Sequence, residues 1–228
     1  MKASTHGEHL IKLTRRRWVN CFLVREDDGL TVVDTATAGV AEEIVDAARE
    51  AGAPIVRITV THGHFDHAGS LDELVKLVPD AEVILPAREA RFMRGDRNVT
   101  PEEEPAEPET IEIREAARGA REVEPGERIG SLEVVGSRGH TLGHVAFLDT
   151  RDRTLIAGDA WIVLGGTSVP NKVNWRFPIP GRATWDPERT LRSARELRAL
   201  NPARLATGHG RVVEDPGSAM DRALAKAG

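Results

Sequence analysis

The order of the periodic segments between residues 40 and 85 is the feature that most constrains the fold. Apolar residues recur at helical spacing from Val40 to Ala51, and Gly52 follows as a helix-ending residue. Residues 55–60 form a nearly continuous apolar run, which is typical of a buried strand. A second helical face spans residues 71–78, and residues 81–85 are another strand candidate. The alternation of helix, strand, helix and strand predicts an α/β fold.

Further elements are expected on both sides of this stretch. Residues 18–24 and 30–33 are apolar runs joined by Asp27-Asp28-Gly29, which predicts a β-hairpin. Strand candidates in the second half are residues 131–135, 145–149, 154–157 and 204–207. Asp186 and Pro187 favour a helix start, and the tail from Pro216 has a helical pattern. We expect a single domain over residues 1–228, in which the proline-rich acidic stretch 95–110 is a polar loop or a lid.

Composition and charge bear on several classes of function. The chain of 228 residues has 31 basic and 36 acidic side chains and no basic block, which disfavours nucleic-acid binding. It contains no run of about 18 apolar residues, so we expect no membrane span. Cys21 is the single cysteine and the first residues lack an apolar signal-peptide core, so we expect a cytoplasmic protein. The expected partner is a small-molecule substrate, and a homodimer is an open alternative.

Three of the eight histidines and one aspartate crowd into the stretch T-H-G-H-F-D-H behind the strand candidate 55–60. The side chains concerned are His62, His64, Asp66 and His67. A spacing of two residues at an extended strand end points two rings to the same side. We expect Gly63 and Gly69 to let the backbone turn here. A polar loop is the alternative, but four dense imidazole and carboxylate ligands favour a metal site.

Three more candidate ligands each follow a strand candidate and stand beside glycine. They are His140 in G-H-T-L-G-H, Asp159 in A-G-D and His209 in G-H-G. Together with the first cluster they make seven candidate ligands, which is enough for two metal ions. His144 belongs to the same G-H-T-L-G-H stretch, and Asp34 ends the strand candidate 30–33.

These motifs, in this order and spacing, resemble the metallo-β-lactamase superfamily from about Asn20 to Gly210. The resemblance implies a four-layer αββα sandwich in which two mixed sheets pack face to face with helices outside. It implies two divalent ions, with Zn²⁺ favoured and iron or manganese as alternatives. The ligands implied for the first ion are His62, His64 and His140. Those for the second are Asp66, His67 and His209, and Asp159 would bridge both ions.

The resemblance also implies roles for the remaining residues. Asp66 is the expected catalytic residue, since a carboxylate beside the nucleophile can take its proton. His144 is expected to support the ligands by hydrogen bonds rather than to bind an ion. For Asp34 the same supporting role and a helix N-cap are both open.

The implied activity is hydrolysis by a metal-bridging hydroxide of an ester-like bond, a lactone, thioester or carboxylic ester, in a small molecule. Asp159 departs from the zinc β-lactamases that share H-x-H-x-D-H, and the absence of tyrosine departs from the lactonases. An iron-dependent oxidoreductase acting on a thiol or small gas is an alternative, and a phosphodiesterase is a further one.

The aromatic residues after Asp159 are the candidates for substrate contacts. Trp161, Trp175 and Phe177 lie in the stretch 161–178, which directly follows a predicted ligand. We expect them either to line an apolar pocket or to fill the core or a contact between two copies.

Overall fold

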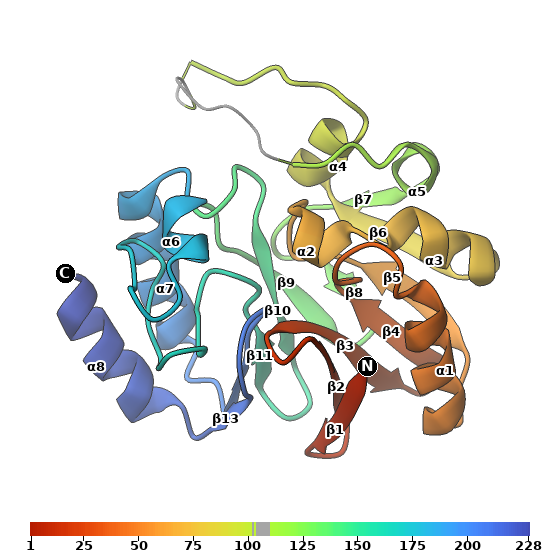
Figure 1. Cartoon of the computed structure of the whole chain (residues 1–228), viewed down its shortest axis with the longest axis horizontal. Coiled ribbons are helices and arrows are strands. Elements are labelled where there is room, and N and C mark those ends of the chain that lie inside the picture. Colours follow the sequence, from red (N-terminus) through yellow and green to blue (C-terminus); the bar gives the residue numbers. More distant parts are fainter. Residues whose placement is uncertain (102, 104–109) are drawn as a thin grey trace. The chain divides into compact units, whose positions relative to one another are not determined.

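Two β-sheets, one in each half of the chain, organise the structure (Figure 1). The structure is a computed structural model and describes residues 1–101, 103 and 110–228. The chain divides into two units, Met1–Val123 and Glu124–Gly228, and each contains one of the sheets. The expectation of a single domain over residues 1–228 stays a prediction.

The sheet of the first unit has the strand order β1-β2-β3-β4-β5-β6-β7. Its strands are β1 (Lys2–His6), β2 (Leu10–Arg15), β3 (Val19–Glu26), β4 (Gly29–Val33), β5 (Ile55–Thr59), β6 (Glu82–Pro86) and β7 (Arg121–Val123). The first four strands pair antiparallel, whereas β4 to β7 pair in parallel. The expected hairpin is confirmed, because β3 and β4 pair with Glu26 opposite Gly29.

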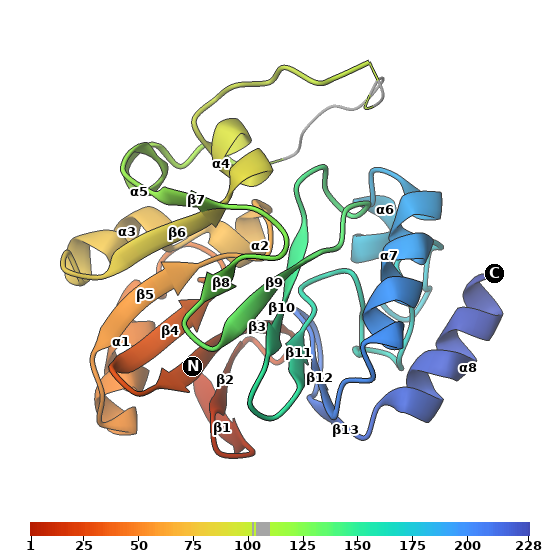
Figure 2. The same ribbon diagram turned by 180° about the vertical axis from the view of Figure 1, so that it is seen from behind.

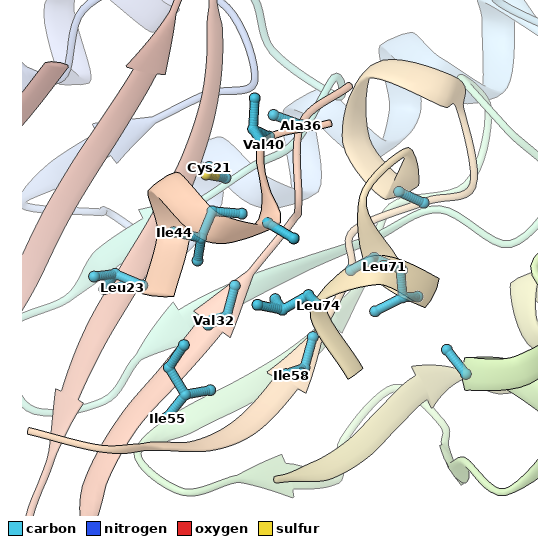
Figure 3. Close-up of a cluster of buried hydrophobic side chains, with 14 of the residues drawn as sticks. Cys21, Leu23, Val32, Ala36, Val40, Ile44, Ile55, Ile58, Leu71 and Leu74 are labelled. Atoms are coloured by element: carbon cyan, nitrogen blue, oxygen red, sulfur yellow. The ribbon is translucent and has the colours of Figure 1, made fainter. Parts of the chain in front are cut away.

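Helices cover one face of this sheet (Figures 1 and 2). The helices of the first unit are α1 (Ala41–Ala51), α2 (Phe65–Ala68), α3 (Leu71–Leu77), α4 (Ala87–Met93) and α5 (Arg114–Arg118). Ile44 of α1 and Leu74 of α3 meet Val32 and Ile58 of the sheet in one buried cluster (Figure 3). Fully burying such a side chain contributes about 1.5–3 kcal/mol. Cys21 belongs to this cluster, and burial raises the pKa of its thiol, so it serves as a small apolar residue.

The sheet of the second unit has the strand order β13-β12-β11-β10-β9-β8. Its strands are β8 (Arg128–Ile129), β9 (Leu132–Gly136), β10 (Val145–Asp149), β11 (Thr154–Ile156), β12 (Arg204–Ala206) and β13 (Val213–Glu214). Its helices are α6 (Ile179–Arg182), α7 (Pro187–Ala199) and α8 (Gly217–Ala227). β11 and β12 pair in parallel and the other neighbours pair antiparallel, so this sheet is mixed like the first.

Asp186 shows how local sequence chemistry fixes the start of a helix. Asp186 caps α7 as expected, because its carboxylate accepts a hydrogen bond of 2.9 Å from the Arg189 N–H.

The hairpin β1–β2 and the helix α4 were not expected from the sequence. Among the residues that the structure describes, none of the helices has the length and apolar character needed to cross a membrane.

The stretch 95–110 falls partly outside the described residues, namely at 102 and 104–109. Among its described residues, Glu103 is buried and forms an ion pair with Arg88 of α4. The guanidinium of Arg88 also lies 4.5 Å from the ring centre of Phe92. This part of the polar loop is therefore anchored to α4, while its predicted role as a lid stays a prediction.

Gly52 gives a direct test of the backbone account. It ends α1 with φ of +77°, and a Cβ added there would meet nothing within 4 Å. Gly52→Ala should therefore lower the free energy of unfolding by about 1 kcal/mol through backbone strain alone. Gly119 ends α5 with φ of −108° and equally open surroundings, so Gly119→Ala should raise that free energy by about 0.4–1 kcal/mol. Denaturant unfolding of both variants checks this, and equal effects would contradict it.

Candidate functional site

The cluster H-x-H-x-D-H begins just beyond β5, beside the end of the parallel neighbour β4. The Asp34 N–H donates to the carbonyl of Thr59 at 3.0 Å, which holds the two strand ends together. The chain then enters the short helix α2, whose first turn contains Asp66 and whose last turn contains His67. All four predicted ligands of the first unit are buried: His62, His64, Asp66 and His67. Buried imidazole and carboxylate groups at the carboxyl ends of parallel strands are typical of a functional site.

The carboxylate of Asp34 connects the two ends of this cluster. Its Oδ1 accepts from the Thr61 N–H at 2.7 Å, and its Oδ2 lies 2.9 Å from Nδ1 of His67. The Thr61 hydroxyl donates to the same carboxylate at 3.1 Å. The N-cap of α1 is Val40, so Asp34 holds His67 and does not cap that helix. This is the first of the two roles considered for Asp34.

These bonds set the protonation of two imidazoles. A carboxylate only accepts hydrogen bonds, so Nδ1 of His67 carries the proton and Nε2 is the nitrogen that can bind a metal. The Thr61 hydroxyl gives its proton to Asp34, so it accepts from Nδ1 of His62 at 3.0 Å. Nε2 of His62 is then unprotonated as well. Asp34 therefore prepares His67 directly and His62 through Thr61.

The rings of the cluster converge within the first unit. Nε2 of His62 lies 3.1 Å from Nδ1 of His64, and the ring centres of His62 and His67 are 4.0 Å apart. When two nitrogens bind the same tetrahedral zinc ion, they lie about 3.3 Å apart. The same distance suits an N–H···N hydrogen bond. The two nitrogens therefore lie at nearly the separation that two ligands of one ion require.

The glycines of the cluster serve close approach rather than turning. Neither Gly63 nor Gly69 has a positive φ, which corrects the expectation from the sequence. A Cβ on Gly63 would lie 2.2 Å from Cγ2 of Thr110, and one on Gly69 would lie 2.3 Å from the carbonyl oxygen of Phe65. Both positions exclude a side chain because neighbouring groups fill the space.

Glu89 is a residue that the sequence analysis missed. Its side chain is fully buried, and Oε2 accepts from the Gly63 N–H and the Thr110 hydroxyl, each at 2.9 Å. Gly63 stands between His62 and His64. Glu89 of α4 therefore helps to hold the backbone that carries these two candidate ligands. The spacing of Glu89 from Phe92 and Met93, three and four residues, places it on the apolar face of α4 and was the available signal.

In the second unit, the register of β11 and β12 brings two predicted ligands together. Ile156 pairs with Ala206 across these parallel strands. Asp159 and His209 each follow three residues later, so both lie beyond the same edge of the sheet. The Gly208 N–H donates to the carbonyl of Gly158 at 3.0 Å, which continues the alignment past the strand ends.

Asp159 lies between two imidazoles of this unit. Its Oδ2 is 3.3 Å from Nε2 of His209 and 3.6 Å from Nε2 of His140. All three side chains are buried. A buried carboxylate this close to two buried imidazoles is stabilised by a positive charge shared among them, which either a proton on an imidazole or a bound cation can supply. One oxygen beside two imidazole nitrogens is also the arrangement required of a carboxylate that bridges two cations.

The protonation of His140 follows from its other neighbour. The Thr184 hydroxyl donates to the carbonyl of Pro180 at 2.8 Å and lies 3.0 Å from Nδ1 of His140. The hydroxyl oxygen therefore accepts from Nδ1, and Nε2 of His140 is unprotonated. This is the nitrogen that faces Asp159.

His144 has a different role from the predicted ligands. Its Nε2 accepts from the Asp159 N–H at 3.1 Å, and its Nδ1 lies 2.8 Å from the hydroxyl of Ser137. Both ring nitrogens are thus engaged by protein groups. His144 holds the backbone of Asp159 in place, and its supporting role beside a metal ion stays a prediction.

The three aromatic residues of the predicted pocket separate in the structure. Trp161 has no exposed surface and belongs to the apolar core of the second unit, which is one of the alternatives left open for it in the sequence. The ring centre of Phe177 lies 4.9 Å from that of His209. Trp175 is 83% exposed. Phe177 and Trp175 therefore remain candidates for substrate contacts, whereas Trp161 stabilises the fold.

The chain matches the model of the Metallo-beta-lactamase superfamily over residues 15–209. The Uncharacterized protein YobT of Bacillus subtilis is 39% identical over 215 residues, which cover 92% of this chain and 90% of that protein. The Probable metallo-hydrolase YflN of the same organism is 25% identical, with 82% and 78% covered. A Hydroxyacylglutathione hydrolase of Rhodospirillum rubrum is 28% identical, with 86% of this chain and 63% of that enzyme covered.

Solved structures share the fold. TTHA1623 in a di-iron-bound form superposes with a TM-score of 0.65 at 25% identity, covering 90% of this chain and 94% of that one. The class B3 di-zinc metallo-beta-lactamase LRA-12 from an Alaskan soil metagenome gives 0.64 at 19% identity, covering 100% and 90%. The fold class expected from the sequence is thereby confirmed.

Asp34→Asn tests the control of His67 by Asp34. The amide oxygen must face the Thr61 N–H, so the amide NH₂ would face Nδ1 of His67 and move the imidazole proton to Nε2. We expect a loss of about 10–100-fold in affinity for one metal ion, with retained folding. Metal content after dialysis and a thermal melt measure these quantities. Asp46→Asn, an exposed change of the same kind, should alter neither, and unchanged metal affinity in Asp34→Asn would contradict the assignment.

Proposed function

The chain belongs to the metallo-beta-lactamase superfamily, and we propose that it is a metal-dependent hydrolase of an ester-like bond in a small molecule. The bond is that of a carboxylic ester, a thioester or a lactone. The observation that carries the proposal is the position of Asp159, with one carboxylate oxygen beside Nε2 of both His140 and His209. Relatives named as a metallo-hydrolase and as a hydrolase of an acylated glutathione support the reaction class.

The donor set suits two divalent ions. We propose that His62, His64 and His140 hold the first ion and that Asp66, His67 and His209 hold the second, with Asp159 between them. The set contains nitrogen and carboxylate oxygen, which zinc, iron and manganese all accept. When bound, such a pair of ions supplies a hydroxide near neutral pH and polarises a carbonyl.

The residues of the chain then have distinct tasks. Asp34, through Thr61 and directly, keeps His62 and His67 in the metal-binding tautomer. His144 holds the backbone of Asp159 by a hydrogen bond. The Thr184 hydroxyl accepts from Nδ1 of His140 and leaves Nε2 of that ring to bind an ion. Asp66 takes the proton of the attacking water and passes it to the oxygen or sulfur that leaves when the acyl bond breaks.

A rate panel tests the proposal. Purified protein is assayed with an aryl ester, a thioester, a lactone, a phosphodiester and a β-lactam under the same conditions. We expect turnover of at least one of the first three, and we expect its loss in Asp159→Ala and His64→Ala. His6→Ala, which alters a histidine of the β1–β2 hairpin, should keep the activity. Full activity and two bound metals in Asp159→Ala would contradict the bridging role.

The same material separates hydrolysis from iron chemistry. The relative TTHA1623 is known in a di-iron-bound form, so the alternative of an iron-dependent oxidoreductase has its own test. Protein purified without added metal is analysed for its elements and for dioxygen uptake with a thiol. Zinc or manganese with ester turnover supports the hydrolase, whereas iron with dioxygen uptake and no ester turnover would replace it. Turnover of the phosphodiester alone would favour a phosphodiesterase.

A further inference from the structure

The segment of residues 172–182, here called the 172–182 segment, presents apolar side chains to solvent. The exposed large apolar side chains among the described residues are Phe65, Leu77, Val173, Trp175 and Ile179. Three of these five lie within the 172–182 segment, and Phe65 directly follows the predicted ligand His64. Single exposed apolar residues are ordinary, but three of them in one short segment indicate a surface that binds a ligand or partner.

The same segment is positively charged in an acidic chain. Lys172, Arg176 and Arg182 are exposed, and no aspartate or glutamate occurs from residue 160 to residue 185. The chain as a whole has a net charge of −5. A group of cations without acidic residues nearby in the sequence attracts anions, and the effect adds to that of the apolar side chains in the same segment.

Contacts within the second unit tie the segment to two predicted ligands. The ring of Phe177 packs on that of His209, with centres 4.9 Å apart. Thr184, just beyond α6, lies 3.0 Å from Nδ1 of His140. A Cβ on Gly181 would lie 2.7 Å from the carbonyl oxygen of Lys172, so the two ends of the segment pack closely together. The exposed cations and apolar groups are thereby attached to the proposed reaction site, with α6 beside α7 (Figure 1).

We propose that the 172–182 segment binds the substrate, and that the substrate is an ester or thioester with an apolar portion and a separate anionic group. This proposal rests on the proposed function and adds the class of substrate to it. Val173, Trp175 and Ile179 bind the apolar portion. Lys172, Arg176 and Arg182 attract the anionic group, a carboxylate or a phosphate.

Matched synthetic esters test this assignment. The probes are p-nitrophenyl esters of similar length that end in a methyl group, a carboxylate or a phosphate, and kcat/KM is measured for each. Arg176→Glu should lower kcat/KM for a charged ester relative to the neutral one about fivefold, through an increase in KM. Trp175→Ala should lower it several-fold for all esters that bind. The charged ester affected more by Arg176→Glu identifies the anion.

The control is Arg222→Glu, which makes the same change of charge on an exposed position of α8 in the same unit. Arg222→Glu should leave the ratio of kcat/KM for the charged ester to kcat/KM for the neutral ester unchanged. If wild type and Arg176→Glu turned over all esters with the same ratio of kcat/KM between charged and neutral esters, the substrate-class proposal would be wrong. The proposed function would not be affected by that result. Absence of turnover of every ester in the wild type, together with absence of thioester and lactone turnover in the rate panel, would instead overturn the proposed function. If Trp175→Ala changed the oligomeric state and left the kinetics unchanged, the segment would be a contact between copies and the proposal would be wrong.

Discussion

The part of the candidate site in the first unit depends on the hydrogen bonds that the Asp34 carboxylate accepts. This carboxylate joins the ends of two parallel strands and decides which nitrogen of His62 and of His67 carries the proton. Asp34 adopts φ of +63°, a left-handed conformation that aspartate tolerates better than most residues. A neutral imidazole binds metal only through its unprotonated nitrogen, so one buried carboxylate determines which nitrogen is available in two candidate ligands.

The second unit reaches the same result with different groups. A hydroxyl, itself bound to a backbone carbonyl, sets the tautomer of His140, and His144 holds the backbone of Asp159. Parallel pairing of β11 with β12 aligns Asp159 and His209, as pairing of β4 with β5 aligns Asp34 and Thr61. In both units the fold presents unprotonated nitrogens at the carboxyl ends of strands. The protein therefore orients its candidate metal ligands through its own hydrogen bonds.

The sequence predicted many of the helices and strands because apolar periodicity is a local property, and histidine spacing, also local, indicated the candidate ligands. It could not predict that Glu89 supports Gly63, since that contact joins residues 26 positions apart. It also could not separate Trp161 from Trp175, because both lie in one aromatic stretch and only packing decides that the first is buried. The reason for glycine at position 63 was likewise a matter of neighbouring atoms rather than of its own backbone angle.

Anomalous diffraction from crystals of the metal-loaded protein tests the central claim most directly. We predict two anomalous peaks, one bound by Nε2 of His62 and the other by Nε2 of His67. The unprotonated nitrogens derived from the hydrogen bonds would then be the atoms that bind the ions. A single peak, or peaks that avoid these nitrogens, would contradict the account.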